Sequence, residues 1–166
     1  MIWVIGFRAA GKTTLGARLA RHLGWEFRDL DREFERRYGK PAEFADRFGI
    51  EQFREEECGL LRGALSGGDR TVIATGGGFV DHAPSREIVA NAPGPKWWVD
   101  PPVEVLWERL QKDESRIKIG DLSSIEGVRV LLEKRRPFYE KIASFRTNGR
   151  DISECLALLE GLADER

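Results

Sequence analysis

Short apolar runs alternate along this chain with longer segments of helical periodicity. The apolar runs predict strands at residues 2–6, 26–30, 70–75, 95–100 and 143–147. Apolar residues spaced three and four apart predict helices at residues 12–23, 32–38, 41–48, 50–65, 84–92, 102–112, 123–141 and 152–164. This alternation predicts an α/β fold of three layers, in which a parallel sheet is flanked by helices on both faces.

The segment Gly6-Phe7-Arg8-Ala9-Ala10-Gly11-Lys12-Thr13 connects the first predicted strand to the first predicted helix. It fits the phosphate-loop pattern G-x-x-x-x-G-K-[ST], in which backbone N–H groups and the start of a helix form an anion site. Strand, loop and helix occur in the required order, which favours this interpretation over a structural turn rich in small residues. The expected ATP contacts in this segment and just after it are Gly6, Ala9, Ala10, Gly11, Lys12, Thr13 and Thr14. Lys12 is expected to reach the β- and γ-phosphates, and Thr13 to be a ligand of Mg²⁺.

Composition narrows the possible functions. The 166 residues predict a single domain, and charged residues nearly cancel to a net charge of −1, which argues against a nucleic-acid partner. No apolar stretch is long enough to span a membrane, and the N-terminus lacks the basic region of a secretion signal. Cys58 and Cys155 are far apart and lack metal spacing, which suits a reducing cytoplasm.

The carboxyl ends of the predicted strands should carry the groups that choose the phosphate acceptor. Asp29 and Asp31 close the second strand, where an extended i, i+2 spacing would point both carboxylates the same way. One would hold the metal, and the other would engage an acceptor hydroxyl and accept its proton. The alternatives are a helix N-cap for Asp31 and a solvated strand end for Asp29.

Further candidates are less specific. Gly76-Gly77-Gly78 follows the third strand and favours close backbone approach to a ligand over a plain flexible loop. Arg54 and Glu57 share a helix face, where a surface ion pair is the simplest interpretation and a carboxylate clamp is the alternative. Asp100 resembles a metal-binding aspartate at a strand end, but Pro101 directly after it favours the start of a turn.

The polar segment 112–124 is either a surface loop or a lid that closes over ATP. Arg116 and Lys118 within it favour the lid. Near the end of the next predicted helix, Arg135 and Arg136 precede Pro137, and a favourable interaction with the helix dipole would suffice to explain them.

Taken together, these motifs resemble the shikimate kinase family. That family has a phosphate loop near its start, then D-x-D, F-R-x-x-E, G-G-G, a lid arginine, and R-x-P-x-Y near its end. This chain carries them in the same order as Gly6 to Thr13, Asp29 with Asp31, Phe53-Arg54 with Glu57, Gly76-Gly77-Gly78, Arg116, and Arg135 with Pro137 and Tyr139.

The resemblance implies a P-loop kinase fold with a five-stranded parallel sheet in the order 2-3-1-4-5. It implies an acceptor-binding region at about residues 31–62, a lid at about 112–124, and a monomer that phosphorylates the 3-hydroxyl of shikimate with ATP and Mg²⁺. The implied catalytic residues are Lys12, Asp31 and Arg116. The implied acceptor contacts are Asp31, Arg54, Glu57, Gly76, Gly77, Gly78 and Arg135. The implied metal contacts are Thr13 and Asp29, and Arg109, Arg116 and Arg150 complete the ATP contacts.

The sequence departs from the family's motifs at two places, and two alternative functions stay open. Ala9 stands where the family usually has glycine, and Arg116-Ile117-Lys118-Ile119 replaces its usual R-P-x-L lid. A gluconate-type kinase of the same fold is one alternative, against which the arginine pair Arg54 and Arg135 argues. The other alternative is a nucleotide-binding regulator without phosphotransfer.

Overall fold

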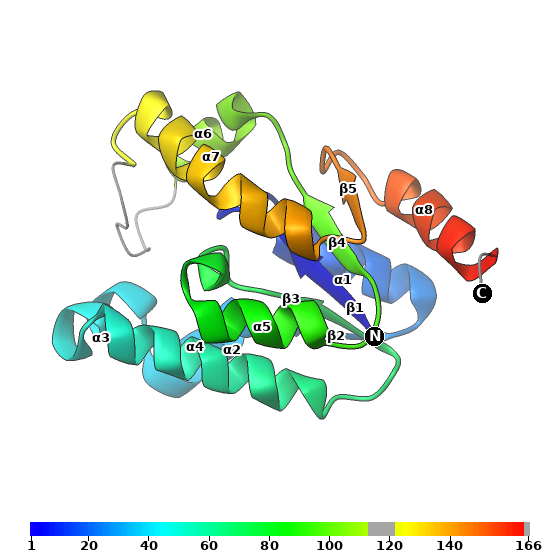
Figure 1. The fold of residues 1–166 in the computed structure, drawn as a ribbon, viewed down its shortest axis with the longest axis horizontal. Coiled ribbons are helices and arrows are strands. Elements are labelled where there is room, and N and C mark those ends of the chain that lie inside the picture. Colours follow the sequence, from blue (N-terminus) through cyan, green and yellow to red (C-terminus); the bar gives the residue numbers. More distant parts are fainter. Residues whose placement is uncertain (113–121, 165–166) are drawn as a thin grey trace.

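The computed structural model describes residues 1–112 and 122–164 of the chain. Within these ranges, five strands form one parallel sheet in the order β2-β3-β1-β4-β5 (Figure 1). The strands are β1 (Ile2–Ile5), β2 (Glu26–Asp29), β3 (Thr71–Ala74), β4 (Lys96–Val99) and β5 (Phe145–Thr147). The parallel sheet and its strand order are therefore confirmed.

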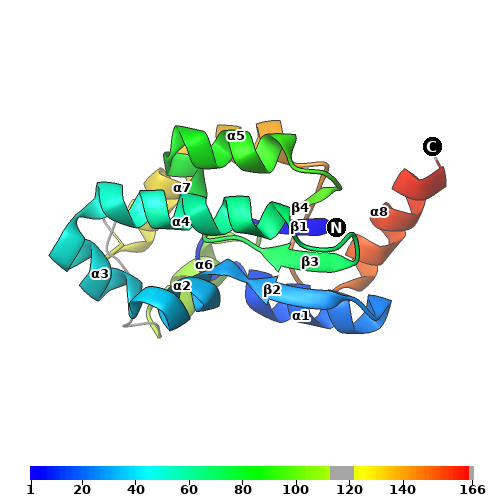
Figure 2. The same ribbon diagram turned by 90° about the horizontal axis from the view of Figure 1, so that it is seen from below.

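Helices cover both faces of this sheet. Their bounds are α1 (Lys12–Leu23), α2 (Leu30–Tyr38), α3 (Pro41–Phe48), α4 (Ile50–Leu65), α5 (Ala83–Asn91), α6 (Val103–Leu110), α7 (Ile125–Ile142) and α8 (Ser153–Asp164). A short 3₁₀ helix, η1 (Phe79–Asp81), precedes α5. Figure 2 shows α4 and α5 on one side of the strands and α1 on the other, which confirms the three layers.

The central strands β1 and β3 are largely apolar on both faces because both of their faces are buried. Val4 and Trp97 point into a core with side chains of α1, α6 and α8, whereas Trp3 and Trp98 point into a second core with side chains of α4, α5 and α7. Each of these three tryptophans is at most 2% exposed. The two cores fix the carboxyl edge of the sheet, where the phosphate loop begins.

The start of α2 differs from the expectation. The helix begins at Leu30 because the Asp29 side chain caps it, accepting a hydrogen bond from the backbone N–H of Arg32 at 3.1 Å. Asp31 is therefore not the N-cap, and it lies in the first turn of α2. The predicted extended geometry, with both carboxylates pointing the same way, is wrong.

A third, smaller aromatic cluster joins α2, α3 and α4. Phe34 of α2 packs edge-on against Phe44 of α3 and Phe53 of α4, with ring centroids 5.3 and 4.8 Å apart. This cluster is separate from the two main cores, and it connects α2, α3 and α4 to one another. The cluster thereby holds α2 and α4 against each other.

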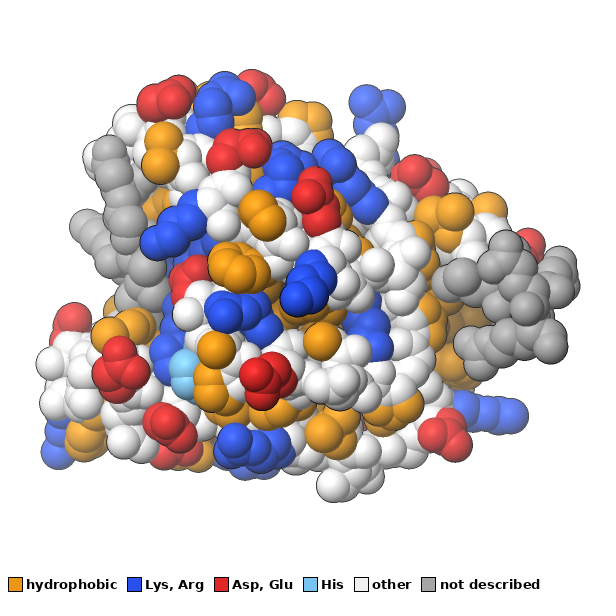
Figure 3. All heavy atoms as spheres, viewed as in Figure 1, with side chains coloured by type: hydrophobic (Ala, Val, Ile, Leu, Met, Phe, Trp, Pro, Cys, Tyr) orange, Lys and Arg blue, Asp and Glu red, His pale blue; other side chains and the backbone are white. Residues whose placement is uncertain are grey.

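Charged side chains of both signs are interspersed on the face seen in Figure 3, in keeping with the net charge of −1. Across the described ranges, helices that combine the length and apolar character of a membrane span are absent.

Candidate active site

The phosphate-loop motif forms the turn between β1 and α1. Gly11 caps α1 with a left-handed φ of 102°, and the Lys12 ammonium donates a hydrogen bond to the backbone oxygen of Phe7 at 2.8 Å. The guanidinium of Arg109, which comes from α6, donates to the backbone oxygens of Ala9 and Ala10 at 3.0 and 3.1 Å. The loop is thus held from within by a lysine and from outside by an arginine.

A cavity of about 430 Å³ opens beside this loop, and we call it the donor cavity. The predicted ATP contacts that line it are Ala9, Gly11, Lys12, Thr13, Thr14, Arg109 and Arg150. Gly6 and Ala10 do not line it. Ala10 is fully buried, and a Cβ atom on Gly6 would lie 2.4 Å from the backbone oxygen of Val99, so both serve the packing of the loop.

A second cavity of about 360 Å³, the acceptor cavity, lies between α2, α4, α7 and the glycine loop. The predicted acceptor contacts that line it are Asp31, Arg54, Glu57, Gly77, Gly78 and Arg135. Thr13 and Asp31 line both cavities, so the two cavities meet at these residues. The carboxylate of Asp31 therefore lies where two bound molecules would touch.

The three glycines after β3 allow the backbone to pass close to these side chains. A Cβ atom on Gly76 would lie 2.6 Å from Glu57 Oε1 and 2.9 Å from Asp31 Oδ1. A Cβ atom on Gly78 would lie 2.6 Å from Arg54 Nη2. Gly76 itself does not line the cavity, but any larger residue there would displace two carboxylates that do.

Arg54 and Glu57 form an ion pair on α4, and the surface location expected for it is wrong. Arg54 is only 7% exposed, and its guanidinium faces the acceptor cavity. Burial raises the pKa of Glu57 to about 7; the charge of Arg54 opposes this shift, and that of Asp31 adds to it.

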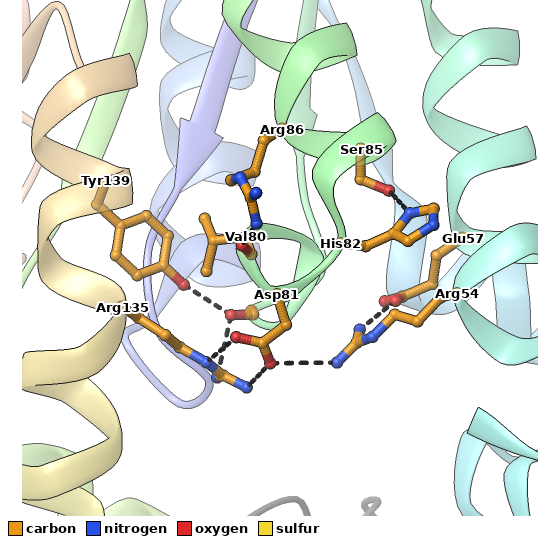
Figure 4. Close-up of polar contacts among 10 residues, drawn as sticks. Arg54, Glu57, Val80, Asp81, His82, Ser85, Arg86, Arg135 and Tyr139 are labelled. Atoms are coloured by element: carbon orange, nitrogen blue, oxygen red, sulfur yellow. Dashed lines mark hydrogen bonds and ion pairs between the residues drawn. The ribbon is translucent and has the colours of Figure 1, made fainter. Parts of the chain in front are cut away.

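Arg135 of α7 lies opposite Arg54 of α4, with Asp81 between the two side chains (Figure 4). It is 2% exposed and donates to the backbone oxygen of Gly77 at 3.3 Å, and the Tyr139 hydroxyl donates to the same oxygen at 2.6 Å. Asp81 of η1, a residue that the sequence analysis did not single out, accepts hydrogen bonds from both arginines. The helix-dipole explanation for Arg135 does not account for these contacts.

Thr13 and Asp29 lie side by side and both line the acceptor cavity. The threonine hydroxyl donates to Asp29 Oδ2 at 2.5 Å. A hydroxyl and a carboxylate oxygen are the hard ligands that Mg²⁺ prefers, and this ion commonly binds through one or two protein groups together with substrate phosphates. Groups of three or more candidate metal-ligating side chains are absent from the described ranges, so a metal here would depend on the nucleotide.

Comparisons with known proteins agree with this geometry. The family model described as "Shikimate kinase" matches residues 8–160. The chain is 34% identical to the shikimate kinase of Nitratidesulfovibrio vulgaris, covering 93% of this chain and 90% of that protein. The solved structure of the Acinetobacter baumannii shikimate kinase in complex with shikimate has a TM-score of 0.86 and 31% identity, covering 99% of this chain and 94% of that one. The chain belongs to the shikimate kinase family.

Other kinases share only the fold with this shikimate kinase family member. A gluconokinase from Sinorhizobium meliloti has a TM-score of 0.57 at 19% identity, covering 99% of this chain and 93% of that one. Both the TM-score and the identity are lower for this gluconokinase than for the A. baumannii shikimate kinase, so the comparison does not favour the gluconate-type alternative.

Two further predicted residues lie apart from the cavities or beyond the structure. Asp100 is buried at the end of β4, where its carboxylate binds Arg136 at 2.9 Å and Arg146 at 2.7 Å, and it lines neither cavity. These ion pairs were not predicted from the sequence, in which Asp100 was expected to start a turn. Arg116, and with it most of the predicted lid, lies outside the described residues.

Proposed function

We propose that this chain transfers the γ-phosphoryl group of ATP to the 3-hydroxyl of shikimate, as its family name implies. The observation that carries the proposal is the junction of the donor and acceptor cavities at Thr13 and Asp31. Phosphoryl transfer requires the attacking hydroxyl and the γ-phosphate to be in line and in contact, and it depends mainly on such positioning.

In this proposal, the carboxylate of Asp31 orients the acceptor hydroxyl and takes its proton. The hydroxyl oxygen then forms a bond to the γ-phosphorus as the bond to the β-phosphate oxygen breaks, and ADP leaves. Lys12, at the start of α1, stabilises negative charge on the phosphates, and Arg116 is proposed to add to this from the lid.

Thr13 and Asp29 are the proposed protein ligands of Mg²⁺. Mg²⁺, when bound with ATP, supplies charge neutralisation at the β- and γ-phosphates. The hydrogen bond from Arg32 N to Asp29 Oδ1 leaves the other carboxylate oxygen directed at Thr13.

Arg54 and Arg135 are proposed to hold the carboxylate of shikimate from two sides. Both guanidinium groups line the acceptor cavity and are buried, so each can donate charge-assisted hydrogen bonds with little competition from water. Arg109 and Arg150 line the donor cavity and are proposed to flank the adenine. We further propose that the enzyme acts as a monomer in the cytoplasm, which the two buried free cysteines suit.

The test is ADP release from ATP and Mg²⁺ with and without shikimate, beside gluconate. Shikimate-dependent release is expected, and release that ignores shikimate or requires gluconate would overturn the proposal.

Asp31→Asn should abolish turnover while ATP affinity, measured by calorimetry, stays within about twofold. The matched control is Asp46→Asn on the exposed side of α3, which should retain full turnover. Equal loss of ATP binding in Asp31→Asn would make Asp31 structural.

A further inference from the structure

The carboxylate of Asp81 occupies the two arginines of the acceptor cavity. Arg135 binds it in a bidentate manner, with Nε donating to Oδ1 at 3.0 Å and Nη2 donating to Oδ2 at 2.5 Å. Arg54 Nη2 approaches the same Oδ2 at 3.5 Å from the other side. Figure 4 shows the aspartate between the two guanidinium groups, which come from different helices.

This arrangement is how a pair of arginines would hold the carboxylate of a ligand. A bidentate arginine–carboxylate contact is among the strongest and most geometrically specific of charged hydrogen bonds. The chain itself therefore supplies a carboxylate to the groups that would bind the acceptor's carboxylate.

The two arginines are more deeply buried than the Asp81 side chain that they bind. Arg54 is held by Glu57 and Arg135 by the Gly77 oxygen, and their side chains are 8% and 2% exposed. The Asp81 side chain is 27% exposed and belongs to a 3₁₀ helix of only three residues. Of the three side chains, that of the aspartate is the most exposed, so turning it towards solvent requires the least change in packing.

We propose that Asp81 is a specificity-determining residue, an internal carboxylate that competes with the acceptor's carboxylate for Arg54 and Arg135. An anionic acceptor must either displace Asp81 or bind beside its negative charge. Both routes weaken the binding of acceptors that carry a carboxylate. A neutral analogue neither competes with Asp81 for the arginines nor is repelled by its charge, so its binding is not weakened. This inference rests on the proposed function for the identity of the acceptor, but its chemistry concerns any small carboxylate in the cavity.

Asp81→Asn tests the proposal, because asparagine keeps the shape of the side chain and removes its charge. The KM for shikimate should fall by about tenfold, with kcat unchanged or higher, since one negative charge is removed from beside the two arginines. The KM for shikimate methyl ester, which is neutral, should stay the same in both proteins. Asp81→Glu, which keeps the charge, should not lower the KM for shikimate.

A matched control is Glu133→Gln, which removes a carboxylate bound to Arg136 at 3.2 Å on the exposed side of α7. It should leave the KM for shikimate unchanged. If Asp81 only positions Arg135, its replacement by asparagine will raise the KM or lower kcat, and that result would overturn the proposal. An equal shift for shikimate and its methyl ester would overturn it as well.

A binding measurement separates this inference from the proposed function. Calorimetric titration with cyclohexanecarboxylate needs no turnover, and Asp81→Asn should bind it about tenfold more tightly than the natural chain. If the natural chain does not phosphorylate shikimate, the proposed function fails, yet this titration still decides the role of Asp81. Equal or weaker binding by the variant would count against competition.

Discussion

Ala9 adopts a left-handed backbone conformation, with a φ of 59°, inside the phosphate loop. Its Cβ atom is strained there, at a cost of about 1–2 kcal/mol, whereas glycine tolerates this conformation freely. The position is also the one where the shikimate kinase resemblance expects glycine. The chain therefore retains a strained residue at the point where backbone N–H groups must face the nucleotide.

Replacing Ala9 by glycine is expected to raise the free energy of unfolding by up to about 1 kcal/mol, because relief of strain outweighs the extra freedom of glycine in the unfolded chain. Urea denaturation of the nucleotide-free protein measures this. Ala10→Gly is the control, since Ala10 is fully buried and has an ordinary φ, and it should lower the free energy. Stabilisation by both variants, or by neither, would contradict the strain argument.

At the scale of elements, the local pattern of apolar residues and glycines was enough to predict most strands and the ends of several helices. Strands buried on both faces, such as β1 and β3, read as continuous apolar runs, and glycines marked the ends of helices. The start of α2 was misjudged because Asp29 and Asp31 both suit an N-cap, and only the folded backbone selects Asp29. The order of the strands came from the family resemblance and not from periodicity.

The role of Asp81 could not be read from local sequence. Arg135 and Asp81 are 54 residues apart, and they meet only because α7 packs against η1. The burial of Arg54 is likewise a tertiary property, since i, i+3 spacing with Glu57 is equally common on exposed helices. From the sequence, arginines could be proposed to bind the carboxylate of an acceptor. The sequence could not show that the carboxylate of Asp81 binds the same arginines.

The glycine loop gives a prediction about elements. Gly76→Ala places a methyl group 2.6 Å from Glu57 Oε1 and 2.9 Å from Asp31 Oδ1, so it should displace these side chains of α4 and α2. We expect kcat/KM for shikimate to fall by at least about tenfold, because small displacements at a reacting centre are costly.

The control for Gly76→Ala is Gly63→Ala, at an exposed position of α4 where an added Cβ meets nothing within 4 Å. It should leave kcat/KM unchanged and stabilise the protein by about 1 kcal/mol, since alanine is the better helix former. Full activity in Gly76→Ala would show that the close approach at the loop is not needed.

At the scale of the whole molecule, the buried carboxyl of Glu57 couples folding to pH. Burial raises its pKa to about 7, whereas the group is ordinary in the unfolded chain, with a pKa of about 4.5. Between these two values the folded protein holds a proton that the unfolded chain has released. Raising the pH through this window therefore favours the unfolded chain, and the stabilisation from this proton is complete below pH 4.5 and lost as the pH approaches 7.

The free energy of unfolding, measured by urea denaturation at pH 5, 6 and 7, should reveal this coupling as a difference between proteins. Glu57→Gln imitates the protonated carboxyl and cannot titrate, so its stability should fall less steeply than that of the natural chain, by up to about 1.4 kcal/mol per pH unit. Glu55→Gln, at an exposed position of the same helix, should keep the natural slope. If Glu57→Gln keeps the natural slope too, Glu57 is ionised throughout this range, and its pairing with Arg54 outweighs its burial.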